Sequence, residues 1–480
     1  MTNTVELVFI PCPGMGHLPP MLELADRLAI REPRLSISVL LVRFPDDTKV
    51  EHYARSVAPV LSPRVKISFL PLKDGVVGHN STDFVFKLIE SHRPDVMDAV
   101  VGLRCVSAFV VDMICTSMMD LATSIGVPSY VFCPAGATFL GFMYYLLESS
   151  DRHGKDFTEY ADSDDMVDFP GLLKPLPATV LPLVMVKKET KDLCLGFIRK
   201  MREAKGVLVN TFAELEPTAL KYLSELEVPP VYPVGPMVRS NRPVEATNSC
   251  AEIFDWLDNQ PELSVVFLCF GSRGSFSKDQ VKEIAVALEK AGHHFLWSLK
   301  TPPEKDNIRI SDDYQSFDGI LPEGFLERTS GIGRVIGWAP QAEILVHPSV
   351  GGFVSHCGWN SILESVWSGV PIGTWPQYSE QQFNAFLMVE ELGLGVDIKM
   401  DYKVDLETGL GLTLVGADEI EKAVRDIMEE GSERRKKVKK MGQIGRKALK
   451  EEGGDSSSYH SLGRFIHDVL TNNPRRSSLC

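Results

Sequence analysis

The chain has 480 residues, of which 44% are hydrophobic and 24% are charged, and this composition excludes a disordered or collagen-like protein. At roughly 150 residues per domain, the length suggests two large domains or three smaller ones. The 50 Lys and Arg residues against 64 Asp and Glu give a formal net charge of −14, which disfavours nucleic acids and anionic membranes as partners.

The cysteine pattern and the N-terminal residues indicate the cellular compartment of the protein. The 9 cysteines are scattered without a Cys-x-x-Cys pair, which is typical of buried thiols and not of a disulfide framework or a zinc site. The first apolar run, residues 7–10, is too short for a signal peptide, and no run approaches the roughly 18 apolar residues of a membrane span. These features predict a soluble, cytoplasmic protein.

The first half alternates short apolar runs with longer helical patterns. Continuously apolar runs suit strands that are covered on both faces, so we expect a parallel sheet with helical crossovers. The expected strands are residues 5–10, 35–42, 65–70, 106–111, 129–133 and 206–211, and the expected helices are about 18–31, 83–103 and 115–126.

A proline-rich segment follows, containing Pro229, Pro230, Pro233, Pro236 and Pro243. Proline cannot continue a helix or a central strand. We therefore expect a domain linker near residues 229–250.

The second half repeats the alternation. Its expected strands are residues 264–270, 293–299, 333–337, 351–355 and 371–375. After the first of them, Ser277 and Gln280 form a capping-box pair at the start of a helix. The whole pattern predicts an α/β protein with two Rossmann-like domains that face each other across a cleft, the default ligand site of such folds.

Common catalytic motifs are missing from the sequence. Residues 13–20 begin like a dinucleotide fingerprint, but Pro19 occupies the position of the third glycine. The run Asp162, Ser163 and Asp164 has the spacing that metal-dependent sugar-nucleotide enzymes use, yet its acidic, polar surroundings favour a solvated loop. We expect neither a metal nor an organic cofactor.

Residues 333–381 carry the strongest functional signal. Within them the run Gly-Gly-Phe-Val-Ser-His-Cys-Gly-Trp-Asn-Ser passes from a strand into a helix, and N–H groups at a helix N-terminus bind anions. His356 could donate to a phosphate, while Asn360 and Ser361 could cap the helix and contact the ligand. Taken alone, the same turn could equally be a plain helix cap with a structural histidine.

Neighbouring side chains favour a sugar nucleotide as the ligand. Trp338 offers a flat face for a base, and Glu364 can accept hydrogen bonds from a ribose diol. Glu380 and Gln381 follow the next strand at the same edge of the sheet, where acidic and amide side chains suit the hydroxyls of a sugar.

This segment resembles the signature box of plant family-1 UDP-glycosyltransferases, which glycosylate small secondary metabolites. The box runs from Trp338 to Gln381 without a gap. The resemblance covers the whole chain, including Pro-Gly-Met-Gly-His at 13–17, Cys-Phe-Gly-Ser at 269–272 and Leu-Pro-Glu-Gly-Phe at 321–325.

The resemblance implies a GT-B type of architecture. Residues 1–240 would form an acceptor-binding domain and residues 251–455 a UDP-sugar-binding domain. Residues 456–480 would form a terminal helix that returns to the first domain, followed by a tail.

The resemblance also implies a donor site. The residues that would hold uracil and ribose are Trp338, Ala339, Gln341 and Glu364, and Ser298 matches a further position on the nucleotide side. Those that would hold the diphosphate are Ser272, His356, Asn360 and Ser361. Those that would hold the sugar are Trp359, Glu380 and Gln381. In this family Gln at the last box position goes with glucose, so Gln381 favours UDP-glucose.

Sugar transfer to a hydroxyl needs a base, for which His17 and Asp112 are the candidates. His17 follows the first strand and Asp112 ends the strand at 106–111, so both can reach one rim of the cleft. A carboxylate on the far imidazole nitrogen would fix the tautomer and stabilise the imidazolium. From the residues alone, a turn histidine and a helix-capping aspartate are equally good readings, and the resemblance makes the two a catalytic pair.

We therefore expect an enzyme that transfers a glucosyl group from UDP-glucose, with inversion and without a metal, to a hydroxyl of a small aromatic acceptor such as a flavonoid or stilbene. Alternatives are a triterpenoid or other non-phenolic acceptor, a UDP-sugar epimerase or phosphorylase, and a non-catalytic UDP-sugar-binding protein. We expect a monomer. Residues that could line the acceptor pocket or simply pack in the core are Phe84, Phe139, Phe142, Tyr144, Tyr145, Met185 and Phe197.

Overall fold

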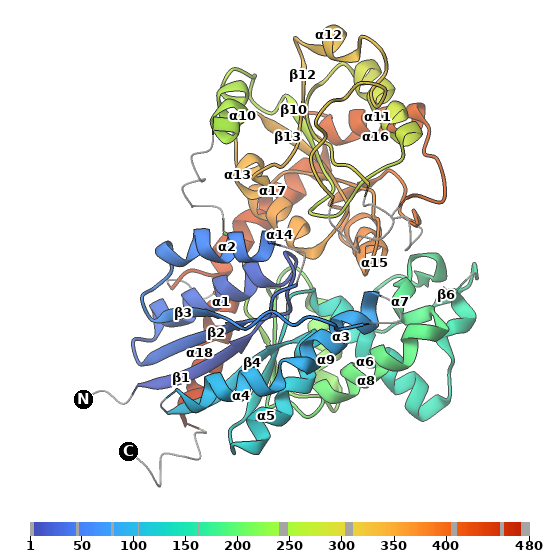
Figure 1. Cartoon of the computed structure of the whole chain (residues 1–480). Coiled ribbons are helices and arrows are strands. Elements are labelled where there is room, and N and C mark those ends of the chain that lie inside the picture. Colours follow the sequence, from blue (N-terminus) through green and yellow to red (C-terminus); the bar gives the residue numbers. More distant parts are fainter. Residues whose placement is uncertain are drawn as a thin grey trace.

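The computed structural model describes residues 4–44, 48–77, 81–103, 105–161, 163–239, 248–302, 311–404, 410–451 and 456–471. Within these residues, two parallel sheets form the centres of two bodies, the first below and the second above in Figure 1. Asp162, residues 240–247 of the expected linker and the tail from 472 onward lie outside the described residues.

The first sheet has seven parallel strands in the order β3-β2-β1-β4-β5-β8-β9. Every residue of β1, β4 and β5 is buried, which agrees with the continuously apolar runs from which these strands were predicted. The strands are β1 (Val5–Ile10), β2 (Leu35–Leu41), β3 (Val65–Phe69), β4 (Val106–Asp112), β5 (Ser129–Cys133), β8 (Val207–Val209) and β9 (Val231–Pro233).

Helices cover the first sheet, and a short antiparallel pair, β6 (Met166–Val167) and β7 (Leu176–Pro177), lies beside them. The helices are α1 (Leu18–Arg31), α2 (Lys49–Val57), α3 (Ser81–Ser91), α4 (Arg93–Val101), α5 (Met119–Ser124), α6 (Ala137–His153), α7 (Leu183–Val186), α8 (Lys188–Met201) and α9 (Pro217–Glu225). Short 3₁₀ helices occur at Ala58–Val60, Met113–Met118, Phe157–Tyr160 and Ala178–Val180.

Two of the expected helices in this body differ from the prediction. The helix expected at 83–103 is divided into α3 and α4, because Pro94 lies in the first turn of α4 and begins a new helix there. The helix expected at 115–126 starts as a 3₁₀ helix, in which Cys115 has non-helical dihedral angles of φ −94° and ψ 22°. The side chain of Asp112 caps this 3₁₀ helix by accepting the N–H of Ile114 at 2.9 Å.

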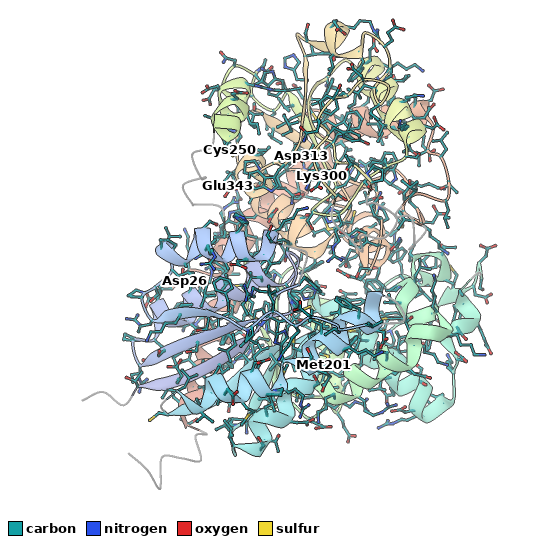
Figure 2. The ribbon with its side chains drawn as sticks, viewed as in Figure 1. Asp26, Met201, Cys250, Lys300, Asp313 and Glu343 are labelled. Carbon is teal, nitrogen blue, oxygen red and sulfur yellow. The ribbon has the colours of Figure 1, made fainter. Side chains whose placement is uncertain are left out.

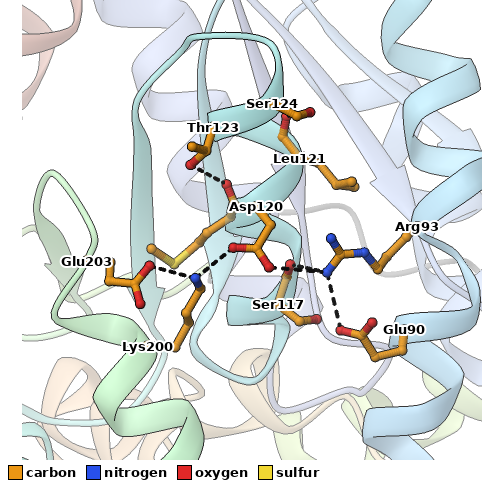
Figure 3. A network of polar contacts seen from close by, with 10 residues as sticks. Glu90, Arg93, Ser117, Asp120, Leu121, Thr123, Ser124, Lys200 and Glu203 are labelled. Atoms are coloured by element: carbon orange, nitrogen blue, oxygen red, sulfur yellow. Dashed lines mark hydrogen bonds and ion pairs between the residues drawn. The ribbon is translucent and has the colours of Figure 1, made fainter.

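A surface network joins several of these helices (Figure 3). The ammonium of Lys200 bonds Asp120 at 2.7 Å and Glu203 at 2.6 Å. Arg93 donates to the carbonyl oxygen of Ser117 at 2.9 Å and lies 3.5 Å from the Asp120 carboxylate. The network therefore ties α4 and α5 to the end of α8, on the face of the first body that lies away from the second.

The second sheet has six parallel strands in the order β12-β11-β10-β13-β14-β15. Its strands are β10 (Val265–Cys269), β11 (His294–Ser298), β12 (Gly333–Ile336), β13 (Val350–Ser355), β14 (Ile372–Thr374) and β15 (Gly395–Asp397). The helices of this body are α10 (Asn248–Asp258), α11 (Lys278–Ala291), α12 (Phe325–Thr329), α13 (Gln341–Leu345), α14 (Trp359–Ser368), α15 (Gln381–Phe386), α16 (Ala417–Met428) and α17 (Glu433–Ala448), with a π-helical turn at Leu387–Glu391.

The short pair β6 and β7 was not predicted, and two strands of the parallel sheets were also missed, both at sheet edges. β9 falls within the proline-rich segment that was expected to act only as a linker. At an edge, Pro233 can end a strand because its missing N–H removes no bond that the sheet needs. β15 is a three-residue strand, too short to show a period in the sequence.

Only one of the two hydrogen bonds of the capping box predicted for α11 is present. Ser277 Oγ accepts the N–H of Gln280 at 3.2 Å, as expected. The Gln280 amide, however, is buried and bonds both the N–H and the carbonyl oxygen of Val415, at 2.8 Å and 2.9 Å, so it serves a tertiary contact instead of the reciprocal cap.

The last helix, α18 (Ser457–Thr471), returns to the first body (Figure 1). It packs beside β9, and Tyr130 of β5 donates its hydroxyl to Asp468 at 2.6 Å. This return and the two Rossmann-like sheets confirm the predicted fold class. Among the described residues, no helix combines the length and the apolar character needed to cross a bilayer.

Candidate active site

The two bodies contact each other through loops that follow their strands. The indole N–H of Trp359 donates to the carbonyl oxygen of Asn210, just after β8, at 2.7 Å. The amide of Asn360 donates to the carbonyl oxygen of Gly16, in the turn after β1, at 2.9 Å. Ligands bind at the carboxyl ends of parallel strands in such folds, and both sheets present that edge here.

His17 and Asp112 meet at this edge, as expected from the sequence. His17 immediately precedes α1, whose first turn holds Pro19 and Pro20, and Asp112 is the last residue of β4. His17 Nδ1 lies 2.9 Å from Asp112 Oδ2, and the Asp112 side chain is fully buried while 29% of the His17 side chain is exposed. The carboxylate oxygen accepts, so Nδ1 carries the proton and Nε2 is the nitrogen left to accept one.

The surroundings of His17 raise its pKa above the ordinary value of 6.5. Burial lowers the pKa, but the charge of Asp112 and the hydrogen bond to it outweigh that effect. The charge of Glu380, from the second body, raises the pKa further, whereas that of Arg273 lowers it. The field at His17 therefore includes charges from both bodies.

The N-terminus of α14 is open, as an anion site requires. The residue before the helix is Gly358, and no side chain caps the first turn. His356 is 7% exposed, and its Nδ1 is buried without a partner. Burial and, next, the charge of Lys300 lower the pKa of His356 to about 4, so its imidazole is neutral near pH 7. A neutral imidazole still donates one N–H to a ligand.

Gly271 lets the loop after β10 approach this histidine closely. Its φ is +75°, and a Cβ there would lie 2.6 Å from His356 Nε2. Only glycine adopts this backbone without strain and leaves room for the ring. Ser272 is the next residue of this loop and is half-buried.

The side chains of two predicted ligand residues form contacts between the two bodies. The buried indole of Trp359 is occupied by the Asn210 bond, so only the backbone N–H of Trp359 at the helix N-terminus remains for a ligand. The Asn360 amide is engaged with Gly16, while its Oδ1 is buried without a partner. Each therefore also fixes the position of one body on the other, which the sequence did not indicate.

Gln341 and Glu364, predicted to hold the ribose, form one cluster with Ser361, which was predicted to hold the diphosphate. Gln341 Nε2 donates to Ser361 Oγ at 2.8 Å and to Glu364 Oε2 at 2.6 Å. Burial raises the pKa of Glu364 to about 7, the Gln341 bond opposes this, and the charge of Glu343 adds to it. Nearby, the Trp338 side chain is 58% exposed, which is unusual for an indole and leaves a face open for stacking.

The other donor-site candidates do not share one cluster, and each makes its own contacts. The Gln381 amide oxygen accepts the N–H groups of Gln377 and Tyr378, at 2.8 Å and 3.0 Å, which leaves its amide NH₂ to donate. Ser298 donates its hydroxyl to the carbonyl oxygen of Gly337 at 2.6 Å, so it holds the backbone before Trp338. Ala339 is buried beside that tryptophan.

Most of the proposed acceptor-pocket residues pack in the core. Phe139, Phe142 and Tyr144 are buried, and the ring of Phe139 meets that of Phe383 edge to face at 5.8 Å, across the two bodies. The start of α6 is held by a buried carboxylate, because Glu216 accepts the N–H groups of Ala137 and Thr138 at 2.9 Å and 2.8 Å. Core packing thus accounts for these aromatic side chains.

Two basic residues at this edge were missed by the sequence reading. Lys300 follows β11 and is buried, and Arg273 lies in the loop after β10. The spacing in the sequence could have indicated Lys300. It lies two residues after Ser298, and alternate residues of an extended chain point the same way.

Comparison with known proteins agrees with this architecture. Residues 208–424 match the family described as UDP-glucoronosyl and UDP-glucosyl transferase. A strawberry (Fragaria ananassa) protein named UDP-glucose flavonoid 3-O-glucosyltransferase 6 is 47% identical, over 98% of this chain and 100% of its own length.

Two solved structures are also similar along their whole length. A transferase from Siraitia grosvenorii in complex with UDP is 42% identical with a TM-score of 0.85, covering 97% of this chain and 100% of its own. Medicago truncatula UGT71G1 complexed with UDP-glucose is 35% identical with a TM-score of 0.86, covering 98% and 99%. The chain belongs to the plant family-1 UDP-glycosyltransferases.

Proposed function

We propose that this protein transfers glucose from UDP-glucose to a hydroxyl of a small phenolic acceptor, with inversion at the anomeric carbon and without a metal. The observation that carries the proposal is that the buried Asp112 orients His17, whose Nε2 has no hydrogen bond to any described residue, while the open N-terminus of α14 contacts the same turn through Asn360 and Gly16. The candidate base and the candidate anion site therefore lie on either side of the contact between Asn360 and Gly16.

In the proposed reaction, the acceptor oxygen attacks the anomeric carbon as its proton passes to His17 Nε2. The new O–C bond forms while the bond from carbon to the β-phosphate oxygen breaks, and UDP leaves with that electron pair. Asp112 stabilises the resulting imidazolium. The N–H groups of α14 and the neutral His356 stabilise the leaving diphosphate.

The donor contacts are those expected from the sequence, except that Trp359, whose indole N–H bonds Asn210, offers only its backbone N–H. Trp338 and Ala339 take uracil, Gln341 and Glu364 take the ribose, and Glu380 with Gln381 takes the sugar hydroxyls. The geometry that supports this is the exposed Trp338 face, the Gln341–Glu364 bond and the effect of the Glu380 charge on His17. The division at residues 1–240, 251–455 and 456–480 remains part of the proposal.

The phenolic acceptor is supported by similarity and by acid–base chemistry. The strawberry relative carries a name that specifies a flavonoid hydroxyl as its target. A phenol, whose pKa is about 10, is acidic enough to lose its proton to an imidazole during attack.

The test is a panel of UDP-glucose, UDP-galactose and UDP-glucuronate with a flavonol, a stilbene, a simple phenol and a triterpenoid alcohol, read by product mass. We expect a hexoside of the phenolic acceptors, formed fastest from UDP-glucose. Consumption of the donor in the absence of any acceptor would instead support an epimerase-like or phosphorylase reaction.

Uridine affinity is expected to fall as the pH is lowered from about 8 to about 6, because Glu364, with a pKa of about 7, accepts ribose bonds best when ionised. Uridine avoids the titration of a phosphate, and His356, with a pKa of about 4, does not titrate in this range. Calorimetry should show this slope in the parent and none in Glu364→Gln. A flat parent profile would rule out the ribose role.

Activity is expected to be unchanged after dialysis against EDTA, because helix N–H groups and His356 supply the leaving-group stabilisation. Chelation tests one particular group of side chains, because Cys12, His17 and Asp112 place potential metal-ligand atoms within 4.8 Å of one another. The measurement is the initial rate of glucoside formation before and after chelation. A loss that added Mg²⁺ or Mn²⁺ restores would overturn the metal-free mechanism.

A further inference from the structure

Lys300 is a buried cation at the carboxyl edge of the second sheet. It stands two residues beyond β11 and is 8% exposed. Its ammonium donates to the carbonyl oxygen of Gly271 at 3.3 Å, a long bond. Burial lowers its pKa, which reflects the cost of holding the charge away from water.

No carboxylate in the described part of the chain forms an ion pair with Lys300. Asp313 is the backbone partner of Lys300, and Figure 2 labels the two in the second body. The Asp313 carboxylate, however, turns toward Gly337 and accepts the N–H of Trp338 at 3.1 Å. The charges of Asp313 and Asp312 raise the Lys300 pKa, but neither carboxylate forms an ion pair with it among the described residues. Lys49 of α2 is a second cation whose charge lowers that pKa. An ammonium in this setting lacks the anion that normally accompanies a buried charge.

The position of Lys300 indicates which anion that would be. Its partner Gly271 is the residue that approaches His356 Nε2, and His356 leads into the open N-terminus of α14. The charge of Lys300 also reaches His356, whose pKa it lowers. Lys300, His356 and the α14 N–H groups therefore converge on one small region, which also contains Ser272.

We propose that Lys300 binds the diphosphate of the donor and neutralises the charge that develops on UDP as it leaves. This inference rests on the proposed function. When the bond between the anomeric carbon and the β-phosphate oxygen breaks, the electron pair stays on that oxygen. The ammonium of Lys300 adds a full positive charge beside the helix N–H groups and the neutral His356. It thereby adds a catalytic residue to those assigned from the sequence.

The test compares UDP with uridine, which lacks the diphosphate, by titration calorimetry. Lys300→Met keeps the length and apolar stem of the side chain and removes the charge. We expect UDP affinity to fall about tenfold or more, as for loss of a charged hydrogen bond, while uridine affinity changes less than about twofold. Lys290→Met, at an exposed residue of α11 that pairs with Asp418, is the matched control and should change neither affinity.

Two outcomes would overturn the assignment. One is UDP binding to Lys300→Met as tight as to the parent. The other is an equal loss for UDP and uridine, which would mean that Lys300 only shapes the site through Gly271. Lys300→Gln provides the same comparison if the methionine variant does not fold, as judged by its thermal unfolding. A parent protein that binds UDP but forms no glucoside would count against the proposed function and leave the Lys300 result standing.

Discussion

Replacing His17 by alanine is expected to lower kcat/KM for glucosylation of a phenol by about 10²- to 10⁴-fold, the usual contribution of a general base. The reason is geometric, because Nε2 of His17 is the basic atom whose partner nitrogen is held by the buried Asp112 at 2.9 Å. The measurement is the initial rate of glucoside formation at saturating UDP-glucose.

UDP affinity should survive this substitution, since His17 belongs to the first body and the proposed donor contacts belong to the second. Calorimetry with UDP therefore separates loss of the base from loss of the site. His153→Ala, at an exposed histidine that ends α6, is the matched control and should retain full activity. Turnover by His17→Ala at the parent rate would remove His17 from the mechanism.

Asp112→Asn is expected to lower kcat/KM by about 100-fold or more. An asparagine that kept the N–H of Ile114 on its oxygen would turn its NH₂ toward His17 Nδ1. Nδ1 would then have to accept, and the proton would move to Nε2, which could no longer act as the base. The measurement is kcat/KM for a phenolic acceptor, with UDP affinity expected to stay within about twofold.

The pH profile adds a second readout for Asp112. The base must be unprotonated, and the His17 pKa lies above 6.5 mainly because Asp112 counteracts the effect of burial. Activity of the parent should therefore fall as the pH drops through that raised pKa, and the residual activity of Asp112→Asn should fall only at lower pH. Asp120→Asn, in the exposed network of α5, is the control and should keep the parent profile. An unshifted acid limb in Asp112→Asn would contradict the pairing.

The central strands could be predicted from the sequence because burial on both faces leaves continuously apolar runs. The runs that became β1, β4 and β10 are examples, and their ends correctly placed His17 and Asp112 at one edge. Edge strands carry no such pattern. β9 contains Pro233 and β15 has only three residues, so both formed through pairing with a neighbour that the local sequence does not specify.

Within the site, the sequence identified residue types and their order but not how each side chain is used. Trp359 and Asn360 belong to the signature segment, yet their side chains bond Asn210 and Gly16, residues more than a hundred positions away. Lys300 was missed because a lysine after a strand is usually solvated. Its burial against Gly271 arises only when β10 and β11 lie side by side.

The most direct test of the account is the anomeric configuration of the product formed from UDP-glucose and a flavonol, determined by NMR. UDP-glucose carries an α-linked sugar, so a single displacement in which His17 deprotonates the attacking hydroxyl predicts a β-glucoside. An α-glucoside would contradict the account, because retention requires a second displacement or a different attack geometry, for which the His17–Asp112 pair would not suffice.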